Sequence, residues 1–361
     1  MKVVIIGAGV AGLSIGWRLA QAGVDVTVLE RAQPASGASW AAAGMIAVTA
    51  ELMDADAAEI EFARYSNDLW QDFAQTLEAV SGQAVGYSQS GALILAEDEA
   101  ALARLSKKAD GIAILSPAEV RALAPLATGA LAGALWSPQE AHVDSRALGV
   151  ALAFAYQLAG GRLIANEAVV RIERRNGRAA IAHTPFGLYH ADVFVLAAGA
   201  WSGLVEAELA PITPVKGEMI ALAPPQGALL PGPVIWGQGI YAVPRNGRLL
   251  IGATMESVGF DTSPTDSAVE FLRGRAEAAM PGLRDWSLVD HWAGLRPRSS
   301  DGLPLLGPTS LDGLWLAGGQ FRNGILFAPA IAENIAAQLM GRAEPIAAFD
   351  PRRMNDSNRK M

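Results

Sequence analysis

Residues 1–30 read MKVVIIGAGVAGLSIGWRLAQAGVDVTVLE, and the fold can be worked out from this stretch. Val3–Ile6 form a short apolar run that is typical of a strand buried on both faces. A helical pattern of apolar residues follows and is broken at Gly23. Residues 24–29 then predict a second strand, with Glu30 at its carboxyl end. This order of strand, helix and strand predicts a βαβ unit.

The turn between the first strand and the helix has the Gly-X-Gly-X-X-Gly spacing of a dinucleotide site. Gly7 permits a tight turn, Gly9 has no Cβ to block a pyrophosphate, and Gly12 lets the helix lie close to the sheet. The free N–H groups of the helix N-terminus receive phosphates in such sites. Glu30 lies 18 residues after Gly12, where an acid accepts hydrogen bonds from the adenosine ribose. We predict nucleotide contacts at Gly7, Ala8, Gly9, Val10, Ala11, Gly12 and Glu30, and the stretch alone leaves the dinucleotide open.

Length and composition limit the class of protein. The chain has 361 residues, enough for two domains or for one large domain with an inserted lobe. Its hydrophobic content of 51% fits a well-buried α/β protein, and its net charge of −8 disfavours nucleic acid as a partner. Cysteine is absent, which excludes disulfides, thiolate catalysis and Cys-ligated metal sites. This composition is compatible with a reducing cytoplasm, where we expect the protein.

The N-terminus resembles a signal peptide only superficially. Lys2 precedes an apolar run, but the run breaks at Gly7, and Arg18 lies where a signal peptide is still apolar. The dinucleotide motif explains the same residues, so we expect no signal peptide. The longest apolar stretches are shorter than the roughly 20 residues that a membrane span needs, so we expect no span.

Two later segments of the chain also have the pattern of a buried strand that ends in small residues. Val193–Trp201 and Leu314–Gly319 have this shape, and the tips of such strands face the cofactor in a doubly wound sheet. From Pro211 to Trp292, short strand patterns alternate with Pro- and Gly-rich turns, which we interpret as an inserted substrate-facing lobe. The predicted fold class is therefore α/β, a Rossmann-type domain with an inserted antiparallel sheet. Helical spacing is found at residues 51–81, 100–108, 117–124, 145–159 and 267–280, and from Pro329 onward.

Local signals set some element boundaries. Asp144 or Ser145 is expected to cap the helix of residues 145–159. Ser116 is expected to cap the helix that begins at Pro117, and the pair at residues 176–177, Asn-Gly, predicts a hairpin turn.

Several polar side chains have no predicted function. We interpret the acids of residues 51–56 as a solvated helix face rather than a metal site, and we predict no metal site elsewhere. The histidines and the lysine are assigned to the surface or to packing. The acids are Glu51, Asp54 and Asp56, and the other side chains are His142, Lys216 and His291.

Four segments together resemble the D-amino-acid oxidase superfamily of FAD-dependent amine oxidoreductases, and the resemblance covers nearly the whole chain. They are the N-terminal motif, Ala42–Met45, Leu196–Trp201 and Gly318–Ile325. Within the superfamily the chain looks most like the glycine oxidases, flavoenzymes linked in many bacteria to making the thiazole of thiamine. The segments that carry this finer resemblance are Tyr241–Arg245, Gly252–Met255, Gly294–Pro297 and Phe321–Leu326.

The resemblance implies FAD rather than NAD as the cofactor. Relatives that hold FAD covalently use a cysteine or a histidine near the N-terminus; this chain has no cysteine and no histidine there, so we predict non-covalent FAD. It implies an FAD-binding domain of residues 1–83, 143–212 and 298–361 and a substrate-binding domain of residues 84–142 and 213–297. The further FAD contacts that it implies are Arg31, Ala42, Ala43, Gly44, Met45, Val170, Ala198, Gly199, Trp201, Gly319, Arg322, Asn323, Gly324, Ile325 and Leu326.

The resemblance also implies how a substrate is held. Arg296 corresponds to an arginine that pairs bidentately with the substrate carboxylate, a geometry that lysine cannot match, and Tyr241 to a tyrosine that reaches the same group. Arg322 corresponds to a second arginine beside flavin and substrate, and Met255 lines the pocket. Glycine oxidases typically have glycine at the position of Ala47, which affects pocket volume. Without the motif, each of these residues would be interpreted as structural.

The chemistry implied is oxidative deamination of a small amino acid such as glycine, sarcosine or a small D-amino acid. The neutral amine passes a hydride from Cα to flavin N5, the imine hydrolyses, and O₂ yields peroxide, so no catalytic side chain is expected. One alternative is a D-amino-acid or N-methyl-amino-acid dehydrogenase that uses a quinone or carrier. Others are an NAD(P)-dependent dehydrogenase and a tRNA-modifying FAD enzyme, which the acidic charge disfavours. The resemblance suggests a homo-oligomer.

Overall fold

The computed structural model describes residues 1–53, 55–108 and 111–354. Its first sheet has six strands, which run parallel except for β18 at one edge. Consecutive residues of β1 point to opposite faces, and both faces are buried, as the apolar run predicts. The strand order is β18 (Leu305–Pro308), β19 (Leu314–Gly318), β12 (Val193–Leu196), β1 (Lys2–Ile6), β2 (Asp25–Leu29) and β8 (Arg162–Ile164).

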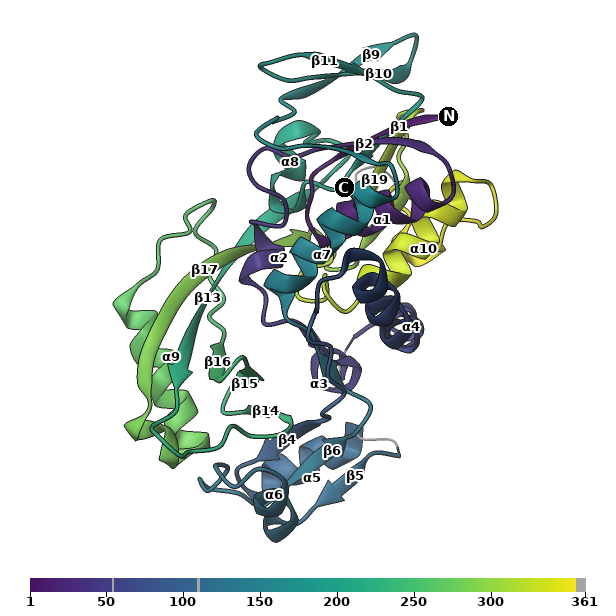
Figure 1. The fold of residues 1–361 in the computed structure, drawn as a ribbon. Helices are drawn as coiled ribbons and strands as arrows, with labels where there is room; N and C mark the ends of the chain where they lie inside the picture. Colours follow the sequence, from purple (N-terminus) through teal and green to yellow (C-terminus); the bar gives the residue numbers. More distant parts are fainter. Residues whose placement is uncertain (54, 109–110, 355–361) are drawn as a thin grey trace.

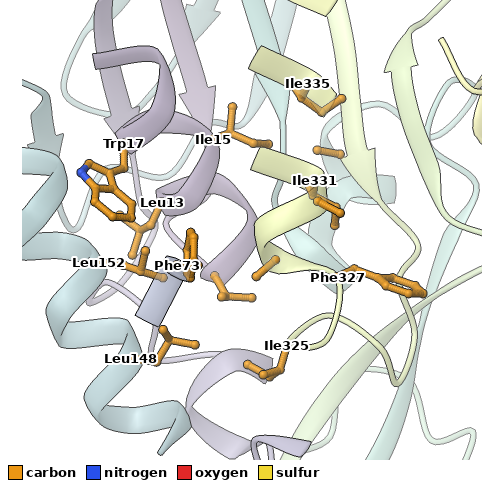
Figure 2. Close-up of a cluster of buried hydrophobic side chains, with 14 of the residues drawn as sticks. Leu13, Ile15, Trp17, Phe73, Leu148, Leu152, Ile325, Phe327, Ile331 and Ile335 are labelled. Carbon is orange, nitrogen blue, oxygen red and sulfur yellow. The ribbon is translucent and has the colours of Figure 1, made fainter. Parts of the chain in front are cut away.

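Three helices, α1, α7 and α10, cover one face of this sheet, α4 packs on α7 and α10, and the apolar side chains of these four helices form the core seen in Figure 2. Leu13 and Trp17 meet Phe73, Leu152 and Ile331 in this core. The other face packs against a small antiparallel sheet. The helices are α1 (Val10–Gln21), α4 (Ala57–Ser81), α7 (Ser145–Leu158) and α10 (Ala328–Leu339), and the small sheet is β11 (Leu188–His190), β10 (Arg178–His183) and β9 (Arg171–Arg175).

A second sheet of eight strands lies beside the first (Figure 1). Two long strands of this second sheet begin or end near the first sheet and extend away from it. These long strands, β13 and β17, pair antiparallel over their whole length. Helices cover the outer face, while the inner face turns toward the small-residue segment around residue 41. The strand order is β17 (Ser287–Ser299), β13 (Ile212–Ala223), β16 (Arg248–Gly252), β15 (Ile240–Arg245), β14 (Val234–Gly237), β4 (Ala92–Ala96), β6 (Gly133–Ser137) and β5 (Ala113–Leu115).

The remaining elements are short connectors and outer helices. They are α2 (Ala38–Ala41), β3 (Met45–Ile46), α3 (Val48–Leu52), α5 (Glu99–Lys108), α6 (Pro117–Leu123), β7 (Ala141–His142), η1 (Gly199–Trp201), α8 (Ser202–Val205), α9 (Asp266–Ala279), η2 (Pro281–Asp285) and η3 (Ala347–Phe349). Within the part of the chain that the structure describes, none of the helices combines the length and the hydropathy that a membrane span requires. The α/β class with a Rossmann-type sheet and a second large sheet is confirmed. The second sheet is antiparallel, as expected, except that β14 and β4 run parallel. The domain boundaries stay a prediction.

The local signals are confirmed. The Asp144 carboxylate accepts the N–H groups of the first turn of α7, and Ser116 forms a capping box with Glu119 at the start of α6. Asn176 and the glycine after it have φ of 50° and 79°, the left-handed pair that a tight hairpin between β9 and β10 requires.

One helix prediction is wrong. Residues 51–81 do not form a single helix: α3 ends at Leu52, and α4 begins only at Ala57, where the Asp56 side chain accepts the Ala58 N–H. The aspartate favours a new helix start because its carboxylate satisfies a backbone donor that has no partner within the helix. Asp54, which was assigned to the same solvated face, lies outside the described residues.

Candidate active site

The glycine motif forms a close-packed turn between β1 and α1. Gly7 has φ of +109°, and a Cβ there would lie 2.4 Å from the Ala197 carbonyl oxygen. A Cβ on Gly12 would lie 2.0 Å from the Gly7 carbonyl oxygen. Only glycine fits at both positions, so the motif brings the N-terminus of α1 against the strand tips.

Glu30 ties together the loops at this edge of the sheet. Its carboxylate accepts the Ala8 N–H at 2.8 Å and the Ala32 N–H at 2.9 Å. Next to it, the Arg31 guanidinium lies 3.5 Å from the centre of the Trp201 ring, a cation–π contact. The acid is therefore held beside the glycine turn, and its contact with a ribose stays a prediction.

One cavity extends from the α1 N-terminus to the segment before α10, and it unites most of the predicted site. Its walls include all five residues predicted to bind substrate. Predicted residues in the lining are Gly9, Val10, Ala11, Ala42, Ala43, Gly44, Met45, Ala47, Gly199, Tyr241, Met255, Arg296, Arg322, Asn323, Gly324, Ile325 and Leu326. Predicted residues outside the lining are Gly7, Ala8, Gly12, Glu30, Arg31, Val170, Ala198, Trp201 and Gly319.

Arg296 enters the cavity from β17 across the neighbouring strand. Its guanidinium lies over Gly217 of β13, where a Cβ would be 2.1 Å from Nη1. The same Nη1 donates a hydrogen bond to the Thr254 carbonyl oxygen at 3.1 Å. Gly217 leaves room for the guanidinium, and the Thr254 carbonyl orients its N–H groups. Together they fix the position of this cation at the cavity wall.

Tyr241 is held in a similar way on β15. Its ring lies over Gly252, where a Cβ would be 2.5 Å from the ring, and its hydroxyl donates to Met219 Sδ at 3.7 Å. Burial raises the pKa of the hydroxyl above its ordinary value, although the nearby Arg296 opposes that shift. The group therefore stays a neutral hydrogen-bond donor at neutral pH.

Glu51 corrects the interpretation of residues 51–56 as a solvated face. Its side chain is only 6% exposed, lines the cavity, and has Oε2 2.8 Å from Arg322 Nη2. Burial raises the pKa of the carboxyl, and the charges of Arg322 and Arg296 partly offset this. Periodicity could not find this acid, because α3 has five residues and is too short for a helical pattern.

A cluster of buried charged side chains lies on the strands β13 and β17. It contains Lys216 and His291, which the sequence assigned to packing or to the surface. The Glu218 carboxylate is fully buried and lies 2.9 Å from Lys216 Nζ and 2.8 Å from His291 Nε2. It also accepts the Thr265 N–H at 2.7 Å, while the Thr254 hydroxyl accepts the Glu218 backbone N–H at 2.9 Å. The cluster thus anchors both ends of the loop that carries Met255. His142, the other histidine of that group, is buried in the β3–β7 pair.

The lining fits a flavin dinucleotide. A chain of small residues at 41–44 leaves room for a flat ring, and Arg245 donates to the Ala43 carbonyl and keeps that segment in place. Across the cavity, the Leu326 carbonyl accepts the Ser66 hydroxyl at 2.6 Å. The buried Gln320 Nε2 and Asn323 Oδ1 line the cavity and have no hydrogen-bond partner among the described residues. Polar atoms of a bound ring can satisfy such groups.

The fold and this cavity define an FAD-dependent oxidoreductase. The family model described as FAD dependent oxidoreductase, DAO, matches residues 2–338, and the chain belongs to this family. The resemblance stated from the motifs is therefore confirmed, and FAD is the cofactor.

Within this family, the chain is similar to several individual proteins. The chain is 36% identical to the glycine oxidase of Pseudomonas aeruginosa over 97% of each chain. It is also 36% identical to the bifunctional protein ThiO/ThiG of Synechocystis, with 97% of this chain but only 54% of that protein covered, so the chain spans about half of that relative. The crystal structure of glycine oxidase from Geobacillus kaustophilus superposes with a TM-score of 0.91 at 32% identity, covering 98% of both chains.

Proposed function

We propose that this protein oxidises glycine or another small amino acid at the carbon that bears the amine. The observation that carries the proposal is the joint presence of Arg296, Tyr241 and the cavity that begins at the α1 N-terminus. The similarity to glycine oxidases of full matching length supports glycine as the first substrate to test.

Arg296 and Tyr241 are proposed to bind the substrate carboxylate. Two parallel N–H donors on Arg296 match the two carboxylate oxygens, and the neutral Tyr241 hydroxyl adds a third donor. The Thr254 carbonyl accepts one N–H of Nη1 and so sets the direction of the fork. The ion pair between Arg296 and the substrate carboxylate would then orient the carbon that bears the amine.

Ala47 and Met255 are proposed to limit the substrate side chain. Both line the cavity, Ala47 from the residue before α3 and Met255 from the loop after β16. A methyl at position 47 takes volume that a glycine would leave free, which favours small substrates. The similarity at 28% identity and TM-score 0.89 to iminodiacetate oxidase from Chelativorans supports including N-substituted glycines among the candidates.

FAD is proposed to be held without a covalent bond by the predicted residues from Gly7 to Gly12 and from Arg322 to Leu326. When bound, it supplies the two-electron oxidation that the side chains of this site do not provide. We propose O₂ as the electron acceptor, with peroxide, a 2-oxo acid and ammonia or an amine as products. A dehydrogenase that uses a quinone or carrier is the alternative, and the ThiO/ThiG relative favours a role in making thiazole.

The test is an absorption spectrum of the purified protein followed by anaerobic addition of glycine, sarcosine and D-alanine. We expect a flavin spectrum that bleaches with at least one of them and returns, with peroxide, when air is admitted. Acid precipitation should release the flavin into the supernatant. A protein that is bleached but reoxidised only by an artificial acceptor would be the dehydrogenase, and a protein without flavin would contradict the proposal.

A further inference from the structure

We propose that the Glu51 carboxylate accepts a hydrogen bond from the substrate amine, and so makes the cavity select amino acids over other small carboxylates. This inference rests on the proposed function and adds a residue to it. Neither the motifs nor the resemblance pointed to Glu51.

The charges of the cavity argue for such a group. Three charged side chains line it, Arg296, Arg322 and Glu51, and Glu51 is the only acid among the described lining residues. A small amino acid brings one carboxylate and one amine. If Arg296 takes the carboxylate, the amine needs an acceptor in the same cavity, and a carboxylate is a stronger acceptor than a carbonyl.

Glu51 has hydrogen-bonding capacity to spare. A carboxylate has about four acceptor sites, and the contact of Glu51 Oε2 with Arg322 Nη2 at 2.8 Å uses one of them. A buried carboxylate with an unused acceptor is costly, so a ligand N–H that reaches it is favoured. The ion pair with Arg322 meanwhile holds the side chain in the cavity instead of letting it turn to solvent.

The surroundings of Glu51 place it beside the substrate-binding groups. Arg296 and Tyr241 both interact electrostatically with it, so carboxylate-binding and amine-binding groups lie within one cluster. Burial raises its pKa, while Arg322 and Arg296 lower it. Ala47, four residues earlier, lines the same cavity, so α3 and the residue before it bring both a volume limit and a charge to the substrate.

The test compares a ligand with an amine and a ligand without one, in holoenzyme. Acetate has the carboxylate but no amine, and its binding is followed by the change in flavin absorbance. Glycine binding is followed by the concentration dependence of anaerobic flavin reduction. For Glu51→Gln we expect the glycine dissociation constant to rise about tenfold or more, as loss of a charged hydrogen bond implies, and the acetate constant to change less than twofold.

Two further variants separate chemistry from folding. Glu51→Asp keeps the charge and should recover part of the glycine affinity. Glu61→Gln, on an exposed position of α4, is the matched control and should behave as wild type. Equal weakening of glycine and acetate by Glu51→Gln would mean that Glu51 acts only through the arginines, and no weakening of either would mean that it does not touch the substrate; each outcome overturns the inference.

The wild type separates this inference from the function on which it rests. Flavin reduction of the wild type by glycine, sarcosine or D-alanine supports the proposed function whatever the variants do. A wild type that none of them reduces overturns the proposed function and this inference with it.

Discussion

Arg296 depends on residues that have no charge themselves. Gly217 leaves the space that its guanidinium fills, and the Thr254 carbonyl sets its direction. Tyr241 has the same dependence on Gly252. At the scale of single residues, the candidate site is therefore made of pairs, in which a glycine on one strand permits a functional side chain on the next.

Replacement of Gly217 by alanine should displace Arg296. The new Cβ would lie 2.1 Å from Nη1, so the guanidinium must move. We expect the apparent KM for glycine to rise at least tenfold, with flavin content unchanged, measured by steady-state peroxide production. Gly274→Ala on α9 is the control, because nothing lies within 4 Å of its Cβ position. An unchanged KM would show that Arg296 is not held in this way.

Removal of the Arg296 guanidinium tests the carboxylate anchor directly. Loss of a charge-assisted pair costs about 1.5–3 kcal/mol, which corresponds to roughly a 10- to 150-fold weaker interaction. We therefore expect Arg296→Ala to raise KM for carboxylate substrates in that range and to leave the flavin bound. Arg298→Ala, two residues along and exposed, is the control. The same KM in both variants would remove Arg296 from the site.

Among the elements, α3 has an unusual cap. Its N-cap residue, Ala47, has no side-chain acceptor, and Glu140 from the β6–β7 turn takes that place. The Glu140 carboxylate accepts the Thr49 N–H at 2.7 Å and the Ala50 N–H at 3.0 Å. An acid from a distant segment thus holds the short helix that presents Glu51 to the cavity.

Glu140 should make stability depend on pH. Burial raises its pKa to about 7, well above the usual value of a glutamate, against the lowering effect of its backbone hydrogen bonds. The folded state therefore binds more protons than the unfolded state between about pH 4.5 and 7, so this carboxyl lowers stability as pH rises through that window, by about 3 kcal/mol at most.

Replacement of Glu140 by glutamine keeps an acceptor for the two N–H groups and removes the titration. We expect the thermal midpoint of the variant to gain on that of wild type as pH rises from 5 to 8. Parallel midpoints over this range would contradict the assignment. Glu99→Gln, at the start of α5, provides the control for loss of one charge.

The strands β13 and β17 share a buried cluster of charged side chains, and disrupting it should lower the free energy of unfolding strongly. Glu218→Ala would leave the buried Lys216 charge without its partner, which typically costs about 3–5 kcal/mol. We expect that loss in denaturant unfolding of the holoenzyme. Glu277→Ala, which breaks a partly exposed pair with Arg273 on α9, should cost less than about 1 kcal/mol. Equal losses would mean that the cluster contributes no more than a surface pair.

In the whole molecule, the cavity lies where the two sheets meet. The α1 N-terminus, the 41–51 segment, the inner face of the eight-stranded sheet and the approach to α10 all line it. A ligand that spans these parts holds them together and stabilises the folded state by mass action.

Removal of FAD should therefore lower the thermal midpoint of the protein, and added FAD should restore it. FMN, which lacks the adenosine half, should restore much less, because the glycine turn at α1 and Glu30 then have no ligand. Midpoints from differential scanning fluorimetry of apoprotein with each flavin check this. Equal recovery with FMN would mean that the N-terminal motif contributes little to cofactor binding.

The sequence by itself determined the βαβ unit, the family, the cofactor and the residues Arg296, Tyr241, Met255 and Ala47, which the structure brings into one cavity. These could be predicted because each depends on local order along the chain: alternating burial in a strand, glycines at fixed spacing, caps beside helix starts, or a short motif.

Only the tertiary structure decided the position of Glu51, the cap from Glu140 and the glycine beneath Arg296. Glu51 meets Arg322 across more than half of the chain, Glu140 reaches α3 from 91 residues away, and Gly217 meets Arg296 on the neighbouring strand. None of these contacts has a local pattern, and α3, with five residues, is shorter than the window of about 11–18 residues in which helical periodicity can be recognised. Which side chains share a cavity is set by how the two sheets pack, and residue spacing has no information about that.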